Sequence, residues 1–397
     1  MSEPAPAVLV LNAGSSSIKG SLHRGDGRRR TVQADLCARE TRLTASATST
    51  EPMAPPRVEV LSSTGEDRWA VALAGILDRL CEETSAGAIA AVGHRVVHGG
   101  REFAAPVVIT PAVRATLESL TPLAPLHQPH GLAAIHAATE RLPRVPQVAC
   151  FDTAFHRTCP EVARRCGLPR EWHDRGIERY GFHGLSYQSI VEQLPALVGH
   201  LPRRLVVAHL GAGASMAAVL DGQSVATTMG FTPLDGLLMS TRCGSLDPGV
   251  VVHLAEGYEL SPKEIGRILS KESGLLGVSG ISGDMRELLG SDAPEARDAV
   301  DLFCYRAITA VGSLAAALGG LDAIVFTAGI GERGAAIRER ICQRLGWLGL
   351  DFDPQANQSH GPRISRESSR VAAWVIATDE AAVIARSTRL ALARLGG

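Results

Sequence analysis

The chain has 397 residues, of which 45% are apolar and 20% charged, and 40 Lys and Arg residues against 41 Asp and Glu give a net charge of -1. This composition excludes a disordered chain, and the length is sufficient for two domains that each bury a core. The balanced charge excludes a general attraction to nucleic acid or to acidic membranes, so an anionic ligand would have to be held by local positive groups.

The sequence predicts no targeting or membrane segment. The first seven residues, MSEPAPA, contain no basic residue, and the apolar run 8–11 is too short for a secretory core. The longest mostly apolar stretch, 307–318, is shorter than the roughly 20 residues that a spanning helix needs. The eight cysteines form no CxxC pair, which favours reduced thiols over zinc or disulfides. We therefore expect a soluble cytoplasmic protein.

The predicted elements alternate along the chain between apolar strands and amphipathic helices. A strand begins at residue 8, and the polar segment 24–67 predicts loops with short, weak strands. A second strand-rich block begins at residue 205. Helical patterns cover 70–84, 112–120, 132–141, 188–198, 262–270, 294–318, 335–345 and 379–395. Proline at position 262 or 294 suits a first helical turn. The alternation predicts an α/β architecture.

One pattern occurs three times: a short apolar strand runs into a polar residue, any residue and glycine. The three copies end in Asn12-Ala13-Gly14, His209-Leu210-Gly211 and Thr327-Ala328-Gly329. After the first two, a second apolar stretch returns and ends at a turn, which predicts one hairpin with a glycine-rich tip in each half of the chain. A duplicated fold with a nucleotide site is one interpretation, and three independent turns are the other.

The glycine-rich tips have the composition of phosphate-binding loops without matching a common motif. The run from Gly14 to Gly20 fails the Walker A spacing, and Gly211-Ala-Gly213 lacks the third glycine of a dinucleotide fingerprint. Glycines nevertheless allow close backbone approach, and exposed N–H groups and hydroxyls can donate to phosphate oxygens.

Several ionisable residues stand in apolar or glycine-rich surroundings. The four segments that contain them are GHRVVHGG, FDTAFH, RYGFHG and MSTRCG. No HExxH pattern or third metal ligand supports a metal site, so we interpret His94, His98, His127 and His130 as hydrogen-bonded core histidines. An arginine among apolar residues needs an anion, which for Arg95 and Arg242 is either a structural carboxylate or a ligand, and the same ambiguity holds for Asp152.

Ten motifs in order resemble the acetate kinase family, a branch of the actin and sugar-kinase superfamily. They are NAGSSSIK, GHRVVHGG, LAPLHQP, FDTAFH, RYGFHG, HLGAGAS, MGFTPLDGL, GVSGISGDMR, FTAGIGE and TDEA, and they extend from residue 8 to about 386. The resemblance implies a duplicated actin-like (ribonuclease H-like) α/β fold of two lobes with the active site in the cleft between them. It implies reversible transfer of the ATP γ-phosphoryl group to acetate, which gives acetyl phosphate and ADP.

The resemblance also implies residue roles. Arg95 and Arg242 would hold acetate and the transferring phosphoryl group, and His183 would donate to that group's oxygens. Asn12 and Glu380 would position Mg²⁺ (with Mn²⁺ as an alternative), and Asp152 would orient a metal-bound water or the substrate. The carboxylate nucleophile is already ionised at neutral pH, so no strong base is required.

The remaining implied residues bind the nucleotide and the acetate methyl group. The phosphate and adenosine sites would contain Lys19, Ser15, Ser17, His209, Gly211, Ala212, Gly213, Asp284, Met285, Arg286, Gly329, Ile330, Gly331 and Arg333. A small turn at Gly329-Ile330-Gly331 would leave room for the purine. The methyl pocket would contain Val97, Leu126, Phe182 and Pro233. Such a pocket discriminates weakly against one extra methylene, so propionate is a second expected substrate.

The chain departs from the family pattern at positions close to these residues. Ala212 and Arg333 stand where asparagine is usual, Cys243 and Ser245 replace serine and aspartate, Leu185 and Tyr187 replace threonine and histidine, and Gln128 replaces asparagine. Loss of a phosphate donor would give a slower enzyme or one with a shifted substrate and need not abolish activity, and Arg333 is a candidate for partial compensation.

The resemblance divides the chain into two lobes and leaves alternatives open. The N-terminal lobe, on the substrate and phosphate side, would comprise 1–153 with 382–397, and the nucleotide-binding lobe 154–381. A homodimer is expected from the family. The alternatives are a kinase that prefers propionate and a nucleotide-binding homologue with impaired catalysis.

Overall fold

The structure, a computed structural model, describes residues 7–14, 17–36, 41–48, 57–61, 68–82, 89–125 and 127–394. The chain forms two compact units, with residues up to Ala154 and from Asp379 onward in unit 1 and Phe155–Thr378 in unit 2. The sequence predicts that the chain returns to the N-terminal unit at residue 382, three residues later than in the structure. Asp379 belongs to unit 1 because its carboxylate binds Arg29 and caps the C-terminal helix, so Glu380 lies in the same unit as Asn12.

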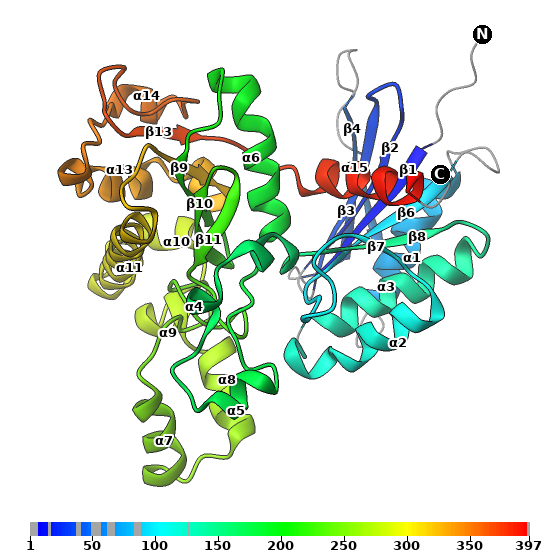
Figure 1. The fold of residues 1–397 in the computed structure, drawn as a ribbon, viewed down its shortest axis with the longest axis horizontal. Helices are drawn as coiled ribbons and strands as arrows, with labels where there is room; N and C mark the ends of the chain where they lie inside the picture. Colours follow the sequence, from blue (N-terminus) through cyan, green and yellow to red (C-terminus); the bar gives the residue numbers. More distant parts are fainter. Residues whose placement is uncertain are drawn as a thin grey trace. The chain divides into compact units, whose positions relative to one another are not determined.

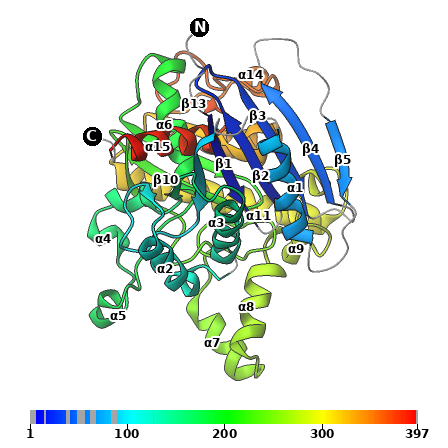
Figure 2. The same cartoon turned by 90° about the vertical axis from the view of Figure 1, so that its right-hand side faces the viewer.

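Unit 1 contains an eight-stranded mixed sheet in the order β5-β4-β3-β2-β1-β6-β8-β7. Figure 2 shows the part from β5 to β1. Strands β1, β6 and β8 are parallel, whereas β1 to β5 form antiparallel neighbours and β7 pairs antiparallel with β8. The strands are β1 (Ala7–Ala13), β2 (Ser17–His23), β3 (Arg29–Asp35), β4 (Thr41–Thr48), β5 (Arg57–Leu61), β6 (Ile89–Val96), β7 (Val107–Val108) and β8 (Gln147–Phe151). The expectation of weak strands in 24–67 was wrong for β3 and β4, whose seven and eight residues continue the ladder from β2.

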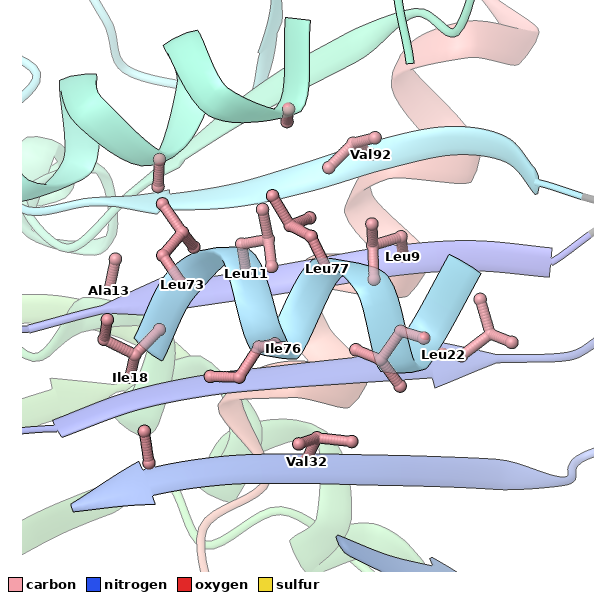
Figure 3. Packing of buried hydrophobic residues seen from close by; sticks show 14 of the residues in the cluster. Leu9, Leu11, Ala13, Ile18, Leu22, Val32, Leu73, Ile76, Leu77 and Val92 are labelled. Carbon is pink, nitrogen blue, oxygen red and sulfur yellow. The ribbon is translucent and has the colours of Figure 1, made fainter. Parts of the chain in front are cut away.

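Helices cover both faces of this sheet. Leu73, Ile76 and Leu77 of α1 (Arg68–Glu82) pack on Leu9 and Leu11 and their neighbours in the strands below (Figure 3). Helix α3 (Gln128–Arg141) joins the same core. Gly93 of β6 packs against Ile384 and Thr388 of α15 (Glu380–Ala393). Successive residues of a strand point to opposite faces of the sheet, so α15 lies on the face opposite α1 and α3. Unit 1 also contains α2 (Pro111–Ser119) and the 3₁₀ turn η1 (Thr121–Leu123).

Unit 2 repeats the central topology of unit 1. Its sheet has the order β11-β10-β9-β12-β13, in which β9, β12 and β13 are parallel and β9 to β11 antiparallel. The strands are β9 (Arg204–Leu210), β10 (Ala214–Leu220), β11 (Gln223–Thr227), β12 (Ala323–Thr327) and β13 (Ala372–Val375). The order β3-β2-β1-β6-β8 in unit 1 has the same directions. The predicted α/β fold with one glycine-tipped hairpin in each half is confirmed.

The helices of unit 2 pack around this sheet and extend away from it (Figure 1). The most extensive contacts with the strands come from α11 (Pro294–Leu318), which packs on β9, β10 and β11. The others are α4 (Glu161–Arg164), α5 (Arg170–Asp174), α6 (Gly184–Val198), α7 (Pro248–Gly257), α8 (Pro262–Lys271), α9 (Gly274–Ser279), α10 (Met285–Leu289), α12 (Ala328–Arg333), α13 (Ala335–Gln343) and α14 (Pro354–Gln358), with η2 (Ala154–Thr158) at the unit boundary and η3 (Gly346–Leu348). Helix α7 is not among the predicted helices, because its three consecutive valines are typical of strands, but they follow an Asp247 cap and a proline.

Helix α11 is long and apolar enough to cross a membrane by length and composition alone. Of its most apolar 18-residue window, 44% is buried within the structure. Phe303, Ala307, Val311 and Leu314 belong to its buried residues. This pattern is typical of a core helix with one face on a sheet.

Candidate functional site

In unit 1, three polar residues lie at the carboxyl ends of the parallel strands. Asn12 is near the end of β1, Arg95 near the end of β6, and Asp152 directly after β8. Parallel pairing of β1 with β6 and of β6 with β8 brings these ends to one edge of the sheet. This edge is where open α/β sheets usually bind ligands.

Arg95 is the centre of this cluster. Its Nη2 lies 2.6 Å from Oδ2 of Asp152, its Nε donates to the same carboxylate, and its Nη1 donates to Oδ1 of Asn12 at 3.1 Å. Burial opposes the charge on Arg95, but the charges of Asp152 and Glu380 more than offset this effect and raise its pKa. The cluster therefore keeps a permanent cation beside two carboxylates.

Asn12 and Glu380 are the predicted metal-positioning residues, and they are in contact. Asn12 Nδ2 donates to Oε2 of Glu380 at 3.2 Å, and the Glu380 side chain is 17% exposed. The described residues include no group of three or more His, Cys, Asp or Glu that could enclose a metal. Mg²⁺ commonly takes only one or two protein oxygens and keeps its other ligands from phosphate and water, so an amide and a partly exposed carboxylate fit such an ion.

The remaining unit 1 predictions lie around this edge or outside the described residues. Lys19 is exposed and pairs with Asn12 across β1 and β2, and Ser17 is half-buried. The Ser17 carbonyl accepts from Gly14 N–H at 2.9 Å and closes the tip of the hairpin. Val97 is half-buried directly after β6. Ser15 and Leu126 lie outside the described residues.

In unit 2, two stacked histidines face the second glycine-rich tip. His183 directly precedes α6, and its ring stacks on His209 of β9 with centroids 4.1 Å apart. An ideal Cβ at Gly213 would lie 3.4 Å from Nε2 of His183, and one at Gly211 would lie 3.8 Å from Nε2 of His209. Both Nε2 atoms therefore point toward the turn that joins β9 to β10.

Arg242 reaches the same turn from a loop. Its Nη2 would lie only 2.6 Å from a Cβ at Gly213, and its Nη1 donates to the carbonyl of Pro233 at 2.5 Å. Among the described residues Arg242 has no carboxylate partner. Burial lowers its pKa to about 10, so the guanidinium is still charged at neutral pH. A half-buried cation without a carboxylate partner is a strong candidate for binding an anionic ligand.

The two predicted methyl-pocket residues in unit 2 are Phe182 and Pro233. Phe182 is buried beside His183, and its carbonyl oxygen lies 3.0 Å from Nε2 of His156. Pro233 is half-buried and orients Arg242 through its carbonyl. These two residues therefore belong to the same local structure as the predicted catalytic groups of this unit.

The predicted nucleotide residues of unit 2 occupy two helix starts. Asp284 caps α10 by accepting from Arg286 N–H, Arg286 also binds it through its guanidinium, and Met285 is buried behind them. The expected small turn at 329–331 is wrong, because Gly329, Ile330 and Gly331 belong to α12. A Cβ at Gly331 would lie 3.3 Å from the backbone of Phe326, so this glycine permits close helix-to-strand packing.

The departures from the family pattern have distinct surroundings. Ala212 holds the Arg242 loop through its carbonyl, which accepts from Ser240 N–H, and Ser245 donates to Asp235. Gln128 bonds the backbone of His98 and Leu117, and Arg333 is exposed at the end of α12.

The interpretation of the paired histidines as structural is confirmed for His94 and His98. His94 binds Gln147 and His98 accepts from Gly100 N–H, and burial lowers the pKa of each ring to about 4. His127 and His130 are half-buried, the latter against Trp69. Ser186 and Ser215 hold the Nδ1 atoms of His209 and His183, and the sequence does not indicate these roles because buried serines in apolar segments carry no local signal.

Gly213→Ala tests the close packing in unit 2. The added methyl group would displace the Arg242 guanidinium, and we expect catalytic turnover to fall about a hundredfold while the thermal unfolding midpoint is nearly unchanged. Gly266→Ala on α8 is the matched control, because its Cβ would meet nothing within 4 Å. Equal kinetics of the two variants would contradict this account.

The two units share one sheet topology, and each has cationic or hydrogen-bond-donating side chains at its glycine-tipped hairpin. These features define a class of protein suited to phosphoryl transfer. A family model described as the acetokinase family matches residues 7–386. The chain belongs to this family and is therefore an ATP-dependent kinase.

Known relatives match over nearly the whole chain. An acetate kinase from Rhodopseudomonas palustris is 50% identical over 393 residues, which cover 96% of each chain. A solved propionate kinase from Francisella tularensis is similar with a TM-score of 0.88 at 35% identity, covering 97% of this chain and 99% of that one. The solved acetate kinase from Porphyromonas gingivalis has a TM-score of 0.85 at 36% identity, covering 98% and 100%.

Proposed function

We propose that this chain catalyses reversible transfer of the γ-phosphoryl group of ATP to the carboxylate of acetate. The observation that carries the proposal is Arg242, a half-buried cation that lies beside His183 at a glycine turn and has no carboxylate partner among the described residues. A transferring phosphoryl group would provide the missing negative charge. The names of the similar kinases support the choice of acetate.

In unit 1, Arg95 would bind the acetate carboxylate, with Asp152 fixing the plane of its guanidinium. Both carboxylate oxygens of Asp152 accept from Arg95, which favours a substrate-orienting role for Asp152 over the orientation of a metal-bound water. Asn12 and Glu380 would hold Mg²⁺, which supplies charge neutralisation on the phosphates when bound. Mn²⁺ would fit the same oxygen ligands.

In unit 2, Arg242 and His183 would donate to the oxygens of the transferring group. Nε2 of His183 and Nη2 of Arg242 lie on the same side of Gly213, so both could reach one phosphoryl group without rearrangement of the turn. His209, Gly211 and Gly213 would contact the nucleotide phosphates. The residues around α10 and α12 would hold the adenosine.

The test is trapping of acyl phosphate as hydroxamate, with ATP, Mg²⁺ and acetate, propionate, butyrate or formate in parallel. Acetyl phosphate as the major product supports the proposal. A clear preference for propionate would favour the second candidate, which the similarity to the Francisella tularensis propionate kinase supports. ATP binding without product from any acid would indicate a nucleotide-binding homologue with impaired catalysis.

Two further proposals concern the protein as a whole. We propose a cytoplasmic location, since ATP and reduced thiols belong to that compartment. We propose a homodimer by analogy with the family, which sedimentation velocity would test.

Arg333→Asn tests whether the unusual arginine on α12 compensates for the alanine at position 212. We expect the Kd for ADP to rise about fivefold, because the variant loses a positive charge that can approach a phosphate. Isothermal titration calorimetry measures the change, and Arg344→Asn, at another exposed arginine of unit 2, serves as the control. Tighter binding by Arg333→Asn would exclude the compensation.

A further inference from the structure

The Nδ1 atom of His183 is held by a hydroxyl chain that sequence analysis did not predict. Nδ1 of His183 lies 2.8 Å from Oγ of Ser215, and this same Oγ is hydrogen-bonded to the hydroxyl of Tyr187. Ser215 and Tyr187 are both fully buried. These two hydroxyls therefore connect the hydrophobic core of unit 2 with the His183 ring, which faces Gly213.

Each member of the chain is fixed by an independent part of the fold. Tyr187 lies one helical turn after His183 on α6, and its ring packs against His156 and Phe155. Ser215 is on β10 opposite His209 in the antiparallel ladder. Residues directly opposite in such a ladder project to the same face, which brings Ser215 to the two stacked histidines.

His183 itself is held in a rare backbone conformation. Its φ of 58° places it in the left-handed region, and its carbonyl accepts from the N–H groups of Ser186 and Tyr187 at the start of α6. The structure that surrounds a non-glycine residue must support such a conformation. The bond from Ser215 to Nδ1 then fixes the remaining freedom, which is the rotation of the ring.

The directions of the hydrogen bonds follow from the chemistry of the three groups. A phenol is a good donor and a poor acceptor, so Tyr187 O–H donates to Ser215 Oγ. The hydrogen of Ser215 is then directed to Nδ1 of His183, which accepts it, so a neutral ring carries its own hydrogen on Nε2. This is the tautomer that can donate toward the space beside Gly213 and Arg242.

We propose that Tyr187 is a positioning residue which, acting through Ser215, holds His183 in the tautomer that donates from Nε2. The inference rests on the proposed role of His183 in phosphoryl transfer. It also gives a purpose to one departure from the family pattern, since Tyr187 stands where histidine is usual. In this chain the hydroxyl of Tyr187 would determine which nitrogen of the His183 ring carries the hydrogen.

The decisive variant is Tyr187→Phe, which keeps the ring and removes only the hydroxyl. The hydrogen of Ser215 is then free to rotate, and His183 can place its hydrogen on Nδ1 and donate to Ser215 instead. We expect kcat for acyl phosphate formation to fall roughly threefold to tenfold while KM for acetate and for ATP stays within twofold. Tyr180→Phe is the matched control, because it removes the hydroxyl of another buried tyrosine of unit 2, one that donates to the backbone carbonyl of Gly176.

The second readout does not depend on turnover. Nitrogen-15 NMR of the histidine rings, assigned with His183→Gln, should show His183 protonated on Nε2 in the parent protein and a mixture of tautomers in Tyr187→Phe. Unchanged His183 resonances together with unchanged kcat in Tyr187→Phe would overturn the proposal, as would a parent ring protonated on Nδ1. Absence of acyl phosphate from the parent protein would instead count against the proposed function, and the NMR result would still decide the tautomer.

Discussion

Arg242→Ala is expected to reduce kcat for acyl phosphate formation by at least about a thousandfold. Arginine residues that stabilise a transferring phosphoryl group are worth roughly 10³ to 10⁵ in rate. In unit 2, Nη2 of Arg242 and Nε2 of His183 both lie close to the position that a Cβ of Gly213 would occupy. Hydroxamate trapping with saturating acetate and MgATP measures the loss.

The same variant should not destabilise the fold. Burial lowers the pKa of Arg242, so its charge is unfavourable in the ligand-free protein, and its one described side-chain partner is the Pro233 carbonyl. Removing a buried cation that has no carboxylate relieves this cost. We therefore expect the unfolding midpoint to stay constant or to rise by a few degrees.

Arg306→Ala provides the comparison for both measurements, because it removes the same charge from an exposed site on α11 in the same unit. It should leave kcat and the unfolding midpoint unchanged. A strongly lowered midpoint in Arg242→Ala would show that this arginine is structural and would remove the observation on which the proposed function depends.

The fold could be predicted from the sequence where motifs and strand periodicity agree. The hairpins around Gly14 and Gly211 were predicted because an apolar strand, a glycine tip and a second apolar stretch occur in each half. The strand at Arg29–Asp35 is longer and more regular than predicted. Its polar, arginine-rich residues do not indicate a strand, because it forms by pairing with the neighbouring strand β2. Local propensity gave the opposite answer at Val250–Val252, where capping by Asp247 and Pro248 determines a helix.

The site was only partly predictable for a related reason. Charged residues in apolar surroundings, such as Arg95 and Arg242, are conspicuous in a sequence because burying them requires a partner. What a sequence leaves open is which partner is present, and the structure distinguishes the two arginines, since Arg95 binds Asp152 whereas Arg242 binds a backbone carbonyl. The hydroxyls of Ser215 and Tyr187 act through long-range contacts that no spacing reveals.

Asp152→Asn should impair both activity and stability, in contrast with Arg242→Ala. Asp152 is fully buried, and both its carboxylate oxygens accept from Arg95. The neutral amide can accept through one oxygen only, so the Arg95 guanidinium loses its fixed plane and most of its neutralising charge. We expect kcat for acyl phosphate formation to fall about a hundredfold and the free energy of unfolding to fall by about 2 kcal/mol, less than for a fully buried pair because Arg95 is 20% exposed.

A second arginine–aspartate pair in the protein makes the comparison quantitative. Arg204 binds Asp322 through its backbone N–H, Nε and Nη2 at the opposite end of the parallel strands in unit 2, and both side chains are about one-third exposed. Asp322→Asn should therefore cost less stability, about 1 kcal/mol, and leave kcat unchanged. A double-mutant cycle with Arg95→Ala and Asp152→Asn should show strong coupling in kcat, because each residue acts through the other. Additive effects in that cycle would mean that Asp152 acts on the substrates independently of Arg95, whereas coupling would identify the pair as one functional unit at the carboxyl ends of β6 and β8.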